Sequence, residues 1–297
     1  MEILNNSLTK EAYYTGLNTY PDSACVHLLN PLSADLNVMR QSLLFGGLES
    51  ITYNRNRKNN DLKFYEFGNC YCFDAKKKDA EKPLNEYSEE FHLGIWICGD
   101  SMNNSWAVPT EKSSVYQLKA YVENVLLRLG IPTDKYEYEA VSNDIYSSAL
   151  IIKTRNRVLG TLGIVAKKLL KQTDVNTEVY FAELNWDALM KEIKKHKVTF
   201  AEISKYPVVK RDLALLLDKA VLFDQIERIA RKSEKKLLKE VSLFDVYEGK
   251  NLPEGKKSYA VNFVLQDDEK TLTDKQIDAI MQKIQKSLEQ ELGASLR

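Results

Sequence analysis

The sequence predicts an α+β protein in which an antiparallel sheet with helical cover precedes a smaller unit of order βαββαβ. Short runs of β-forming or alternating residues recur through both halves, and most of them are joined by turns rather than by helical crossovers. Only a few segments carry an apolar stripe at helical spacing. A charged stretch at residues 194–197 separates two lengths of chain, each long enough for one domain. We therefore predict domains at residues 1–195 and 198–297, with a solvated linker between them.

The clearest helix of the first half covers residues 114–129. Leu118, Val122 and Leu126 lie on one apolar stripe, and Gly130 with Pro132 provides the stop signal. A second helical pattern extends to Tyr53, although two adjacent glycines weaken it. A closing helix is predicted at residues 186–194 and a charged loop at 76–90. The predicted strands are residues 26–29, 64–68, 71–73, 92–98, 136–140, 148–153, 158–165 and 179–184.

The second half alternates strands and helices in a ferredoxin-like order. Its last helix opens with a capping box from Thr273 to Gln276 and continues with an apolar stripe that includes Ile277 and Ile284. The predicted segments are strand 212–217, helix 222–233, strands 238–247 and 258–266, helix 273–290 and strand 294–297. In such a fold both helices cover one face of the sheet, which leaves the other face free to bind a ligand.

Composition excludes several classes of function. Lys+Arg and Asp+Glu are both 42, so no global charge attracts nucleic acid or anionic membrane, and any RNA contact must be local. No apolar run of about 18 residues and no signal pattern is present, so we expect a cytoplasmic protein without membrane contact. The 4 cysteines follow neither a CxxC nor a disulfide spacing, and with 3 histidines no structural metal site is expected.

Motifs of catalysis are missing from the sequence. The glycines at 160 and 163 lie inside an apolar hairpin, without the lysine and the following helix of a phosphate loop. Neither GxSxG nor HExxH occurs, and no motif places a pair of carboxylates. We therefore nominate no catalytic residue and no cofactor for this chain.

The candidate binding residues gather on one predicted hairpin. FDVYEG at residues 244–249 is followed, after a turn, by GKKS at 255–258. An aspartate can accept hydrogen bonds from a base edge, a tyrosine can stack on a base, and lysines can meet phosphate, which together suit a reader of single-stranded RNA. From these residues alone, the alternative is an ordinary edge hairpin with polar residues on its solvated side.

Motifs in both halves resemble one family. In the second half they are PVVKRDLA (207–214), FDVYEG, GKKS, KTLTD (270–274) and ASLR (294–297), and in the first half NSL (6–8), NPLS (30–33), MRQSLL (39–44) and FYEFG (64–68). They are similar to the C-terminal portion of the bacterial phenylalanyl-tRNA synthetase β subunit. That portion is a class II synthetase-like module without an active site, followed by a ferredoxin-fold anticodon-binding domain. Phe45 departs from the pattern, because the family usually has proline there.

The resemblance implies a non-catalytic part of phenylalanine–tRNA ligase that contacts tRNA(Phe) and supports a catalytic α subunit in an α2β2 assembly. The family's α subunit activates phenylalanine with ATP and Mg²⁺, so these cofactors are expected for the whole ligase and not for this stretch of chain. In agreement, residues 158–170 contain no arginine, and only Arg157 lies beside them. We expect the chain alone to make no phenylalanyl-adenylate.

The resemblance also implies the RNA-binding residues. Asp245, Tyr247 and Ser258 correspond to the family's residues that meet the first anticodon base. Strand alternation agrees with this, because it puts Asp245 and Tyr247 on one face, and Ser258 begins the neighbouring strand. The expected phosphate partners are Lys256, Lys257 and Arg211.

The α-subunit surface is expected at residues 30–53, a segment that resembles the interface helix and strand of class II synthetases. Its apolar residues exceed what one helix needs to cover its own sheet. The expected interface residues are Met39, Arg40, Leu43, Leu44 and Leu48. Without the α subunit, this patch should drive weak self-association as an isologous dimer. The alternative is that these residues fill the domain's own core.

Two other functions stay open at this point. The first half could be a small-molecule ligase with its own ATP site, although the missing arginines argue against it. The second half could be a ligand-sensing module that binds an amino acid at a helix–sheet edge, since the ferredoxin-like fold has many functions. That alternative gives no reason for the tyrosine, lysines and serine of the hairpin.

Overall fold

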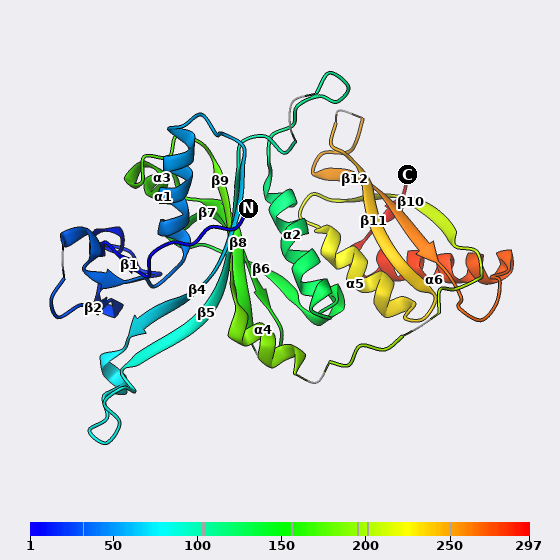
Figure 1. Ribbon diagram of the computed structural model, residues 1–297. Coiled ribbons are helices and arrows are strands. Elements are labelled where there is room, and N and C mark those ends of the chain that lie inside the picture. Colours follow the sequence, from blue (N-terminus) through cyan, green and yellow to red (C-terminus); the bar gives the residue numbers. More distant parts are fainter. Residues whose placement is uncertain (32, 103–104, 156, 195, 201, 250) are drawn as a thin grey trace. The chain divides into compact units, whose positions relative to one another are not determined.

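The computed structural model describes residues 1–31, 33–102, 105–155, 157–194, 196–200, 202–249 and 251–297 (Figure 1). The chain divides into two compact units, Met1–Val198 (unit 1) and Thr199–Arg297 (unit 2), each with its own hydrophobic core. Lys195 of the predicted linker, Leu32 of the NPLS motif and two predicted turn residues, Asn156 and Lys250, lie outside the described residues. Among the helices described, none is long and apolar enough to span a membrane.

A 6-stranded antiparallel sheet forms the centre of unit 1, in the order β4-β5-β9-β8-β7-β6. The strands are β4 (Leu62–Phe73), β5 (Tyr87–Cys98), β6 (Glu137–Val141), β7 (Tyr146–Lys153), β8 (Val158–Val165) and β9 (Val179–Asn185). β4 and β5 pair along their whole length, whereas β9 pairs only with the inner half of β5, from His92 to Cys98. The outer half of the β4–β5 hairpin therefore projects as a two-stranded ribbon (Figure 1).

Helices cover both faces of this sheet. One core joins the sheet to the helices α1 (Leu44–Arg55) and α3 (Lys167–Gln172), and a second core joins the opposite face to α2 (Val115–Arg128) and α4 (Trp186–Ile193). The N-terminal segment adds a small sheet on the α1 side, made of β1 (Leu8–Thr9), β2 (Val26–His27) and β3 (Val38–Met39). The short 3-10 helices are η1 (Glu11–Tyr13), η2 (Asp22–Ala24), η3 (Ala34–Leu36), η4 (Ala75–Lys77) and η5 (Thr133–Lys135).

The structure corrects two expectations for unit 1 and adds one helix that was not predicted. The charged loop predicted at residues 76–90 ends earlier, because Tyr87 already pairs with Phe73 and begins β5. The helical pattern before Tyr53 becomes helix only from Leu44, and β3 precedes it. The helix α3 was not predicted, since six residues are too short for a periodic pattern.

Unit 2 has the predicted βαββαβ order. Its elements are β10 (Val209–Asp218), α5 (Phe223–Ser233), β11 (Leu238–Tyr247), β12 (Lys256–Leu265), α6 (Asp274–Leu292) and β13 (Ser295–Leu296). The 4 strands are antiparallel, in the order β11-β12-β10-β13. The capping box at Thr273 is present, and Gly293 ends α6 in the left-handed conformation that turns the chain into β13.

Alternation along the strands gives this sheet two different faces. Val261, Phe263 and Leu265 of β12 are buried with the inward residues of α5 and α6, whereas Ala260 and Asn262 point to the opposite side. We call the side away from these helices the open face. The register between β11 and β12 shifts between Leu243 and Asp245, which is a β-bulge at the start of the candidate hairpin.

Candidate nucleic-acid interface

Asp245, Tyr247 and Ser258 share the open face of unit 2. Tyr247 is paired directly with Ser258 across the β11–β12 ladder, and Asp245 is paired with Ala260. The expectation that alternation puts Asp245 and Tyr247 on one face is therefore confirmed. Asp245 is exposed and Tyr247 is half-buried, while Ser258 is only 6% exposed. The aromatic ring lies close to the turn, since a side chain at Gly249 would meet the Tyr247 hydroxyl at 2.4 Å.

The terminal strand adds a cation to this surface. The Arg297 amide donates to the Ala214 carbonyl at 3.0 Å, so Arg297 continues the pairing of β13 with β10. Its guanidinium carbon lies 5.1 Å from the centroid of the Tyr247 ring, within the range of a cation–π interaction. From the sequence we placed Arg297 in the ASLR motif but gave it no binding role, because its contact with Tyr247 depends on the order of strands in the sheet.

Lys256 is the predicted lysine that lies on the open face. It is opposite Asp218 of β10, and its ammonium forms an ion pair with that carboxylate at 2.9 Å. Because the pair is partly exposed, it is weak and a phosphate could compete with Asp218 for the lysine.

The other two predicted phosphate partners lie on the helix-covered face. Arg211 is opposite Phe263 of the core, and its guanidinium is 3.9 Å from Asp274 at the start of α6. Lys257 is opposite Leu217 and is 5% exposed, and its ammonium donates to the Tyr259 hydroxyl at 2.7 Å. Arg211 and Lys257 therefore cannot meet the same stretch of RNA backbone as Tyr247. Their predicted role as phosphate partners beside Tyr247 is contradicted by strand alternation, which puts both residues on the other face of the sheet.

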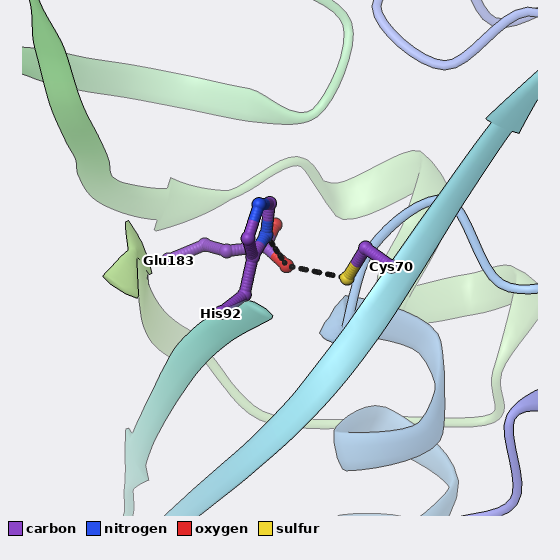
Figure 2. A group of neighbouring side chains, drawn as sticks. All are labelled: Cys70, His92 and Glu183. Carbon is purple, nitrogen blue, oxygen red and sulfur yellow. Dashed lines mark hydrogen bonds and ion pairs between the residues drawn. The ribbon is translucent and has the colours of Figure 1, made fainter. Parts of the chain in front are cut away.

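Unit 1 contains a second cluster of chemistry-bearing side chains, formed by Cys70, His92 and Glu183 (Figure 2). They come from the neighbouring strands β4, β5 and β9. The His92 Nδ1 atom is 3.2 Å from Glu183 Oε1, and the Cys70 thiol points at the same oxygen from 3.7 Å. Glu183 interrupts an otherwise apolar buried strand, which is the sequence signal that could have identified it.

Glu183 also joins the sheet to the segment before α1. Its carboxylate accepts from the Leu43 amide at 2.8 Å, the Ser42 hydroxyl at 2.7 Å and the Tyr20 hydroxyl at 3.1 Å. Burial alone would raise the pKa of Glu183, but the hydrogen bonds from His92, Leu43 and Ser42 lower it below its usual value.

The surroundings of the histidine in this cluster favour its protonated form. Burial opposes its charge, yet its hydrogen bond to Glu183, the charge of Glu183 and the nearby Glu90 raise the pKa of His92. Burial raises the pKa of the Cys70 thiol far above its usual range, and the charge of Glu183 adds to this effect. These shifts favour a neutral Cys70 thiol and a protonated His92 beside the ionised Glu183 carboxylate.

Cysteine, histidine and glutamate are metal-ligand types, so we tested whether this cluster is a metal centre. Metal binding requires a thiolate and an imidazole nitrogen without its proton. Here burial favours the protonated form of the Cys70 thiol, and both oxygens of Glu183 already accept hydrogen bonds from neighbouring groups. The cluster is best interpreted as a satisfied polar network that fixes the segment before α1 to the sheet.

Large side chains fill the sheet face next to this network. Trp96 stacks on Phe181 with the ring centroids 5.0 Å apart, and a side chain at Gly47 of α1 would lie 2.1 Å from the indole. Arg40 is the buried arginine of this region, and its guanidinium binds the Glu66 carboxylate at 2.7 Å. It is therefore engaged within the protein and not presented to a nucleotide phosphate.

The predicted α-subunit interface is corrected by burial. Leu43, Leu44 and Leu48 are 0% exposed and belong to the core between α1 and the sheet, and Arg40 is 5% exposed. Only Met39 of the predicted set keeps partial exposure. The apolar residues that indicated a partner surface pack instead against the long strands and the N-terminal segment, which together cover α1. Phe45, where the resembled family has proline, stacks on Tyr13 with a centroid distance of 4.7 Å.

Comparison with known proteins gives matches to both units. Residues 1–186 match the family described as "Phenylalanyl tRNA synthetase beta chain CLM domain", and residues 204–297 match the "Ferredoxin-fold anticodon binding domain". The chain is 63% identical over 297 residues to the phenylalanine–tRNA ligase beta subunit of Bacteroides fragilis, which covers 100% of this chain and 36% of that protein. With the corresponding subunit of Porphyromonas gingivalis the identity is 57%, with the same coverage of 100% and 36%.

A solved structure of pyrrolysyl-tRNA synthetase from Desulfitobacterium hafniense also matches, with a TM-score of 0.47 and 13% identity over 66% of this chain and 63% of that one. The chain spans 36% of the length of the two β subunits from Bacteroides fragilis and Porphyromonas gingivalis.

Proposed function

The chain belongs to the family of phenylalanyl-tRNA synthetase β chains, and we propose that it is a non-catalytic part of such a subunit that binds tRNA(Phe) near the anticodon. The observation that carries this proposal is the row of functional groups on the open face of unit 2. Tyr247, Ser258 and Asp245 lie together there, away from the helices, and Lys256 is on the same face.

Each of these groups has a physical role in reading one unstacked base. The half-buried Tyr247 ring offers a face for stacking, and Asp245 accepts from the donor edge of the base. The Ser258 hydroxyl, opposite Tyr247, supplies a further donor or acceptor. Lys256 exchanges Asp218 for a backbone phosphate when RNA binds. The balanced net charge of the chain fits a contact of this local kind.

Unit 1 supports a catalytic subunit and does no chemistry itself in this proposal. The sheet face beside Glu183 is filled by Trp96 and Phe181, and Arg40 is bound to Glu66. ATP and Mg²⁺ then belong to the α subunit of the ligase, and the two kinds of subunit form an α2β2 assembly. Phenylalanine-dependent pyrophosphate exchange by the purified chain, above the level of a mock preparation, would contradict this part of the proposal.

Binding of tRNA is tested by titrating the 297-residue chain with tRNA(Phe) and with an unrelated tRNA over a series of salt concentrations. We expect tRNA(Phe) to bind more tightly at every salt concentration, because base contacts at the open face add to the phosphate contacts shared by both. The Tyr247→Ala variant should reduce this preference. The proposal would be contradicted if the two tRNAs bound equally and if neither Tyr247→Ala nor Asp245→Asn changed their affinity.

A further inference from the structure

Unit 1 contains a cavity of about 400 Å³ on the sheet face that packs against α2 and α4. Its floor consists of three cross-strand pairs between β4 and β5, which are Lys63–Ile97, Tyr65–Ile95 and Phe67–Leu93. The helix α2 packs mainly on β5, β8 and β9, and the cavity opens beside it over the edge strand β4. Small-molecule sites have volumes of about 300–1,000 Å³, so this cavity is large enough to hold a ligand.

Aromatic rings line one end of the cavity. Phe67 meets Trp186, the first residue of α4, edge to face with the ring centroids 4.8 Å apart, and Tyr65 meets Phe67 in the same way at 6.3 Å. Phe67 and Trp186 are half-buried, and Tyr65 is 38% exposed. Rings in edge-to-face contact readily receive a further ring, so this end of the cavity favours an aromatic group.

Two hydrogen-bond donors complete the lining. The Lys63 ammonium donates to the Ser101 carbonyl, which is a neutral group and leaves the positive charge of the lysine uncompensated by this contact. The Tyr121 hydroxyl of α2 accepts from Gln117 Nε2 at 3.1 Å, so the hydroxyl is held in place while its own proton stays available for an acceptor. A cation and a hydroxyl donor next to an apolar floor suit a carboxylate.

Two aspartates near Lys63 are engaged with other groups. Asp61 and Asp100 line a neighbouring cavity that also contains Lys63. Asp61 accepts from the Asp100 amide at 2.7 Å, and Asp100 forms an ion pair with Lys112 at 2.5 Å. The described hydrogen bond of Lys63 is therefore the one to Ser101, and a ligand carboxylate can replace that carbonyl.

We propose that this cavity is a binding site for a small aromatic carboxylic acid. The ring of the ligand packs against Phe67 and Trp186, and its carboxylate accepts from Lys63 and Tyr121. The inference goes beyond the proposed tRNA contact, because the cavity lies in unit 1 and the tRNA site in unit 2. It gives unit 1 a ligand and no chemical step.

The experiment titrates the 297-residue chain with 3-phenylpropionate, which carries the ring and the carboxylate, and follows binding by saturation-transfer NMR. The matched probe is 2-phenylethylamine, which has the same ring but a positive charge. We expect 3-phenylpropionate to bind with a dissociation constant of about 1–5 mM, the range for a ligand of about ten non-hydrogen atoms. The amine should bind about tenfold more weakly, because it meets the Lys63 ammonium in place of an acceptor.

Val125→Phe tests the position of the site, since Val125 of α2 lines the cavity and a larger side chain there occupies the space of the ligand. Leu127→Phe is the matched control, because Leu127 is on the same helix but is 63% exposed. We expect Val125→Phe to abolish binding of 3-phenylpropionate and Leu127→Phe to leave it unchanged. Circular dichroism shows whether each variant is folded.

Lys63→Gln tests the carboxylate contact and does not depend on filling the cavity. Its control is Lys112→Gln, which removes the charge of a lysine that is 82% exposed and paired with Asp100. We expect Lys63→Gln to weaken binding of 3-phenylpropionate roughly three- to tenfold and to remove the preference over the amine, as for one charge-assisted hydrogen bond. Lys112→Gln should retain the wild-type affinity and preference.

Three results would overturn the inference. They are a lack of saturable binding of 3-phenylpropionate to the wild-type chain, equal affinity of this chain for the acid and the amine, and unchanged binding by both folded Val125→Phe and Lys63→Gln. None of these variants alters unit 2, so each should bind tRNA(Phe) like the wild type. Failure of tRNA binding would therefore contradict the proposed function and leave the cavity site standing.

Discussion

The two sheets of this protein are both antiparallel, but they differ in what covers them. The sheet of unit 1 has helices on both faces, and its buried polar groups, such as Glu183 and His92, are satisfied by other groups of the same chain. The sheet of unit 2 has α5 and α6 on one face, whereas Asp245 on the other is exposed. A buried polar residue in the first sheet therefore contributes to stability, whereas an exposed one on the open face of the second, such as Asp245, is available for binding.

The largest expected effect is the loss of the buried carboxylate at Glu183. Glu183→Gln should lower the free energy of unfolding of unit 1 by about 3–5 kcal/mol, because it leaves the charged His92 without its buried partner. All 3 tryptophans, Trp96, Trp106 and Trp186, lie in unit 1, so urea unfolding followed by tryptophan fluorescence reports on this unit.

The matched control is Glu139→Gln, which removes an exposed carboxylate paired with Lys153 in the same sheet. We expect a change below about 1 kcal/mol for this surface pair. Equal destabilisation by the two substitutions would show that burial does not distinguish the polar groups of unit 1.

The second effect concerns Leu48. From the sequence we predicted this residue for a partner surface, but it is buried in the core of unit 1. Leu48→Ala should cost about 2–5 kcal/mol of unfolding free energy, as for other core leucines. Leu127, which is on α2 and is 63% exposed, provides the control, and Leu127→Ala should cost much less. A stable Leu48→Ala variant that has lost affinity for the α subunit would restore the original interface prediction.

The third effect is on binding and concerns the open face. Tyr247→Ala should weaken tRNA(Phe) binding by about 1–3 kcal/mol through lost stacking, whereas Tyr247→Phe should stay close to wild type because the ring remains. Tyr259→Phe is the control on the helix-covered face, next to the buried Lys257, and should not change the affinity. A loss of binding in Tyr259→Phe equal to that in Tyr247→Ala would remove the distinction between the two faces.

The smallest effect is the pH dependence of unit 1. Because the folded protein raises the pKa of His92 above its ordinary value of 6.5, the protonated form stabilises the fold. This contribution is complete below pH 6.5 and is lost as the pH rises through the raised pKa. The free energy of unfolding should therefore fall with rising pH in this window, and less so in His92→Gln. Identical slopes in wild type and variant would exclude a charged His92.

The sequence predicted unit 2 well because each element carried a local signal. The capping box at Thr273 and the apolar stripe of α6 are local patterns, and the order of elements followed from them. The sequence could also have shown that Arg211 and Lys257 lie on the face opposite Tyr247. Each of them is an even number of residues away from the buried apolar residues of its own strand. That information was outweighed by their charge, which is typical of phosphate-binding residues.

Other features depend on contacts between segments that are distant in the sequence. The Glu183 carboxylate accepts a hydrogen bond from the Leu43 amide, 140 residues away in the sequence. No local pattern near either residue predicts this contact. The position of Arg297 beside Tyr247 requires the strand order of the whole sheet. The apolar stretch around Leu48 has the composition of both a core and an interface, and only its packing against the sheet decides between the two.

The central claim is that the open face of unit 2 meets the anticodon of tRNA(Phe). Photo-crosslinking tests it most directly, with a 4-thiouridine at the first anticodon position and mass spectrometry of the crosslinked peptides. We predict crosslinks to β11 and β12 around Tyr247 and Ser258, which are suppressed by competing unlabelled tRNA(Phe). Crosslinks confined to unit 1, or to the outer surfaces of α5 and α6, would contradict the account.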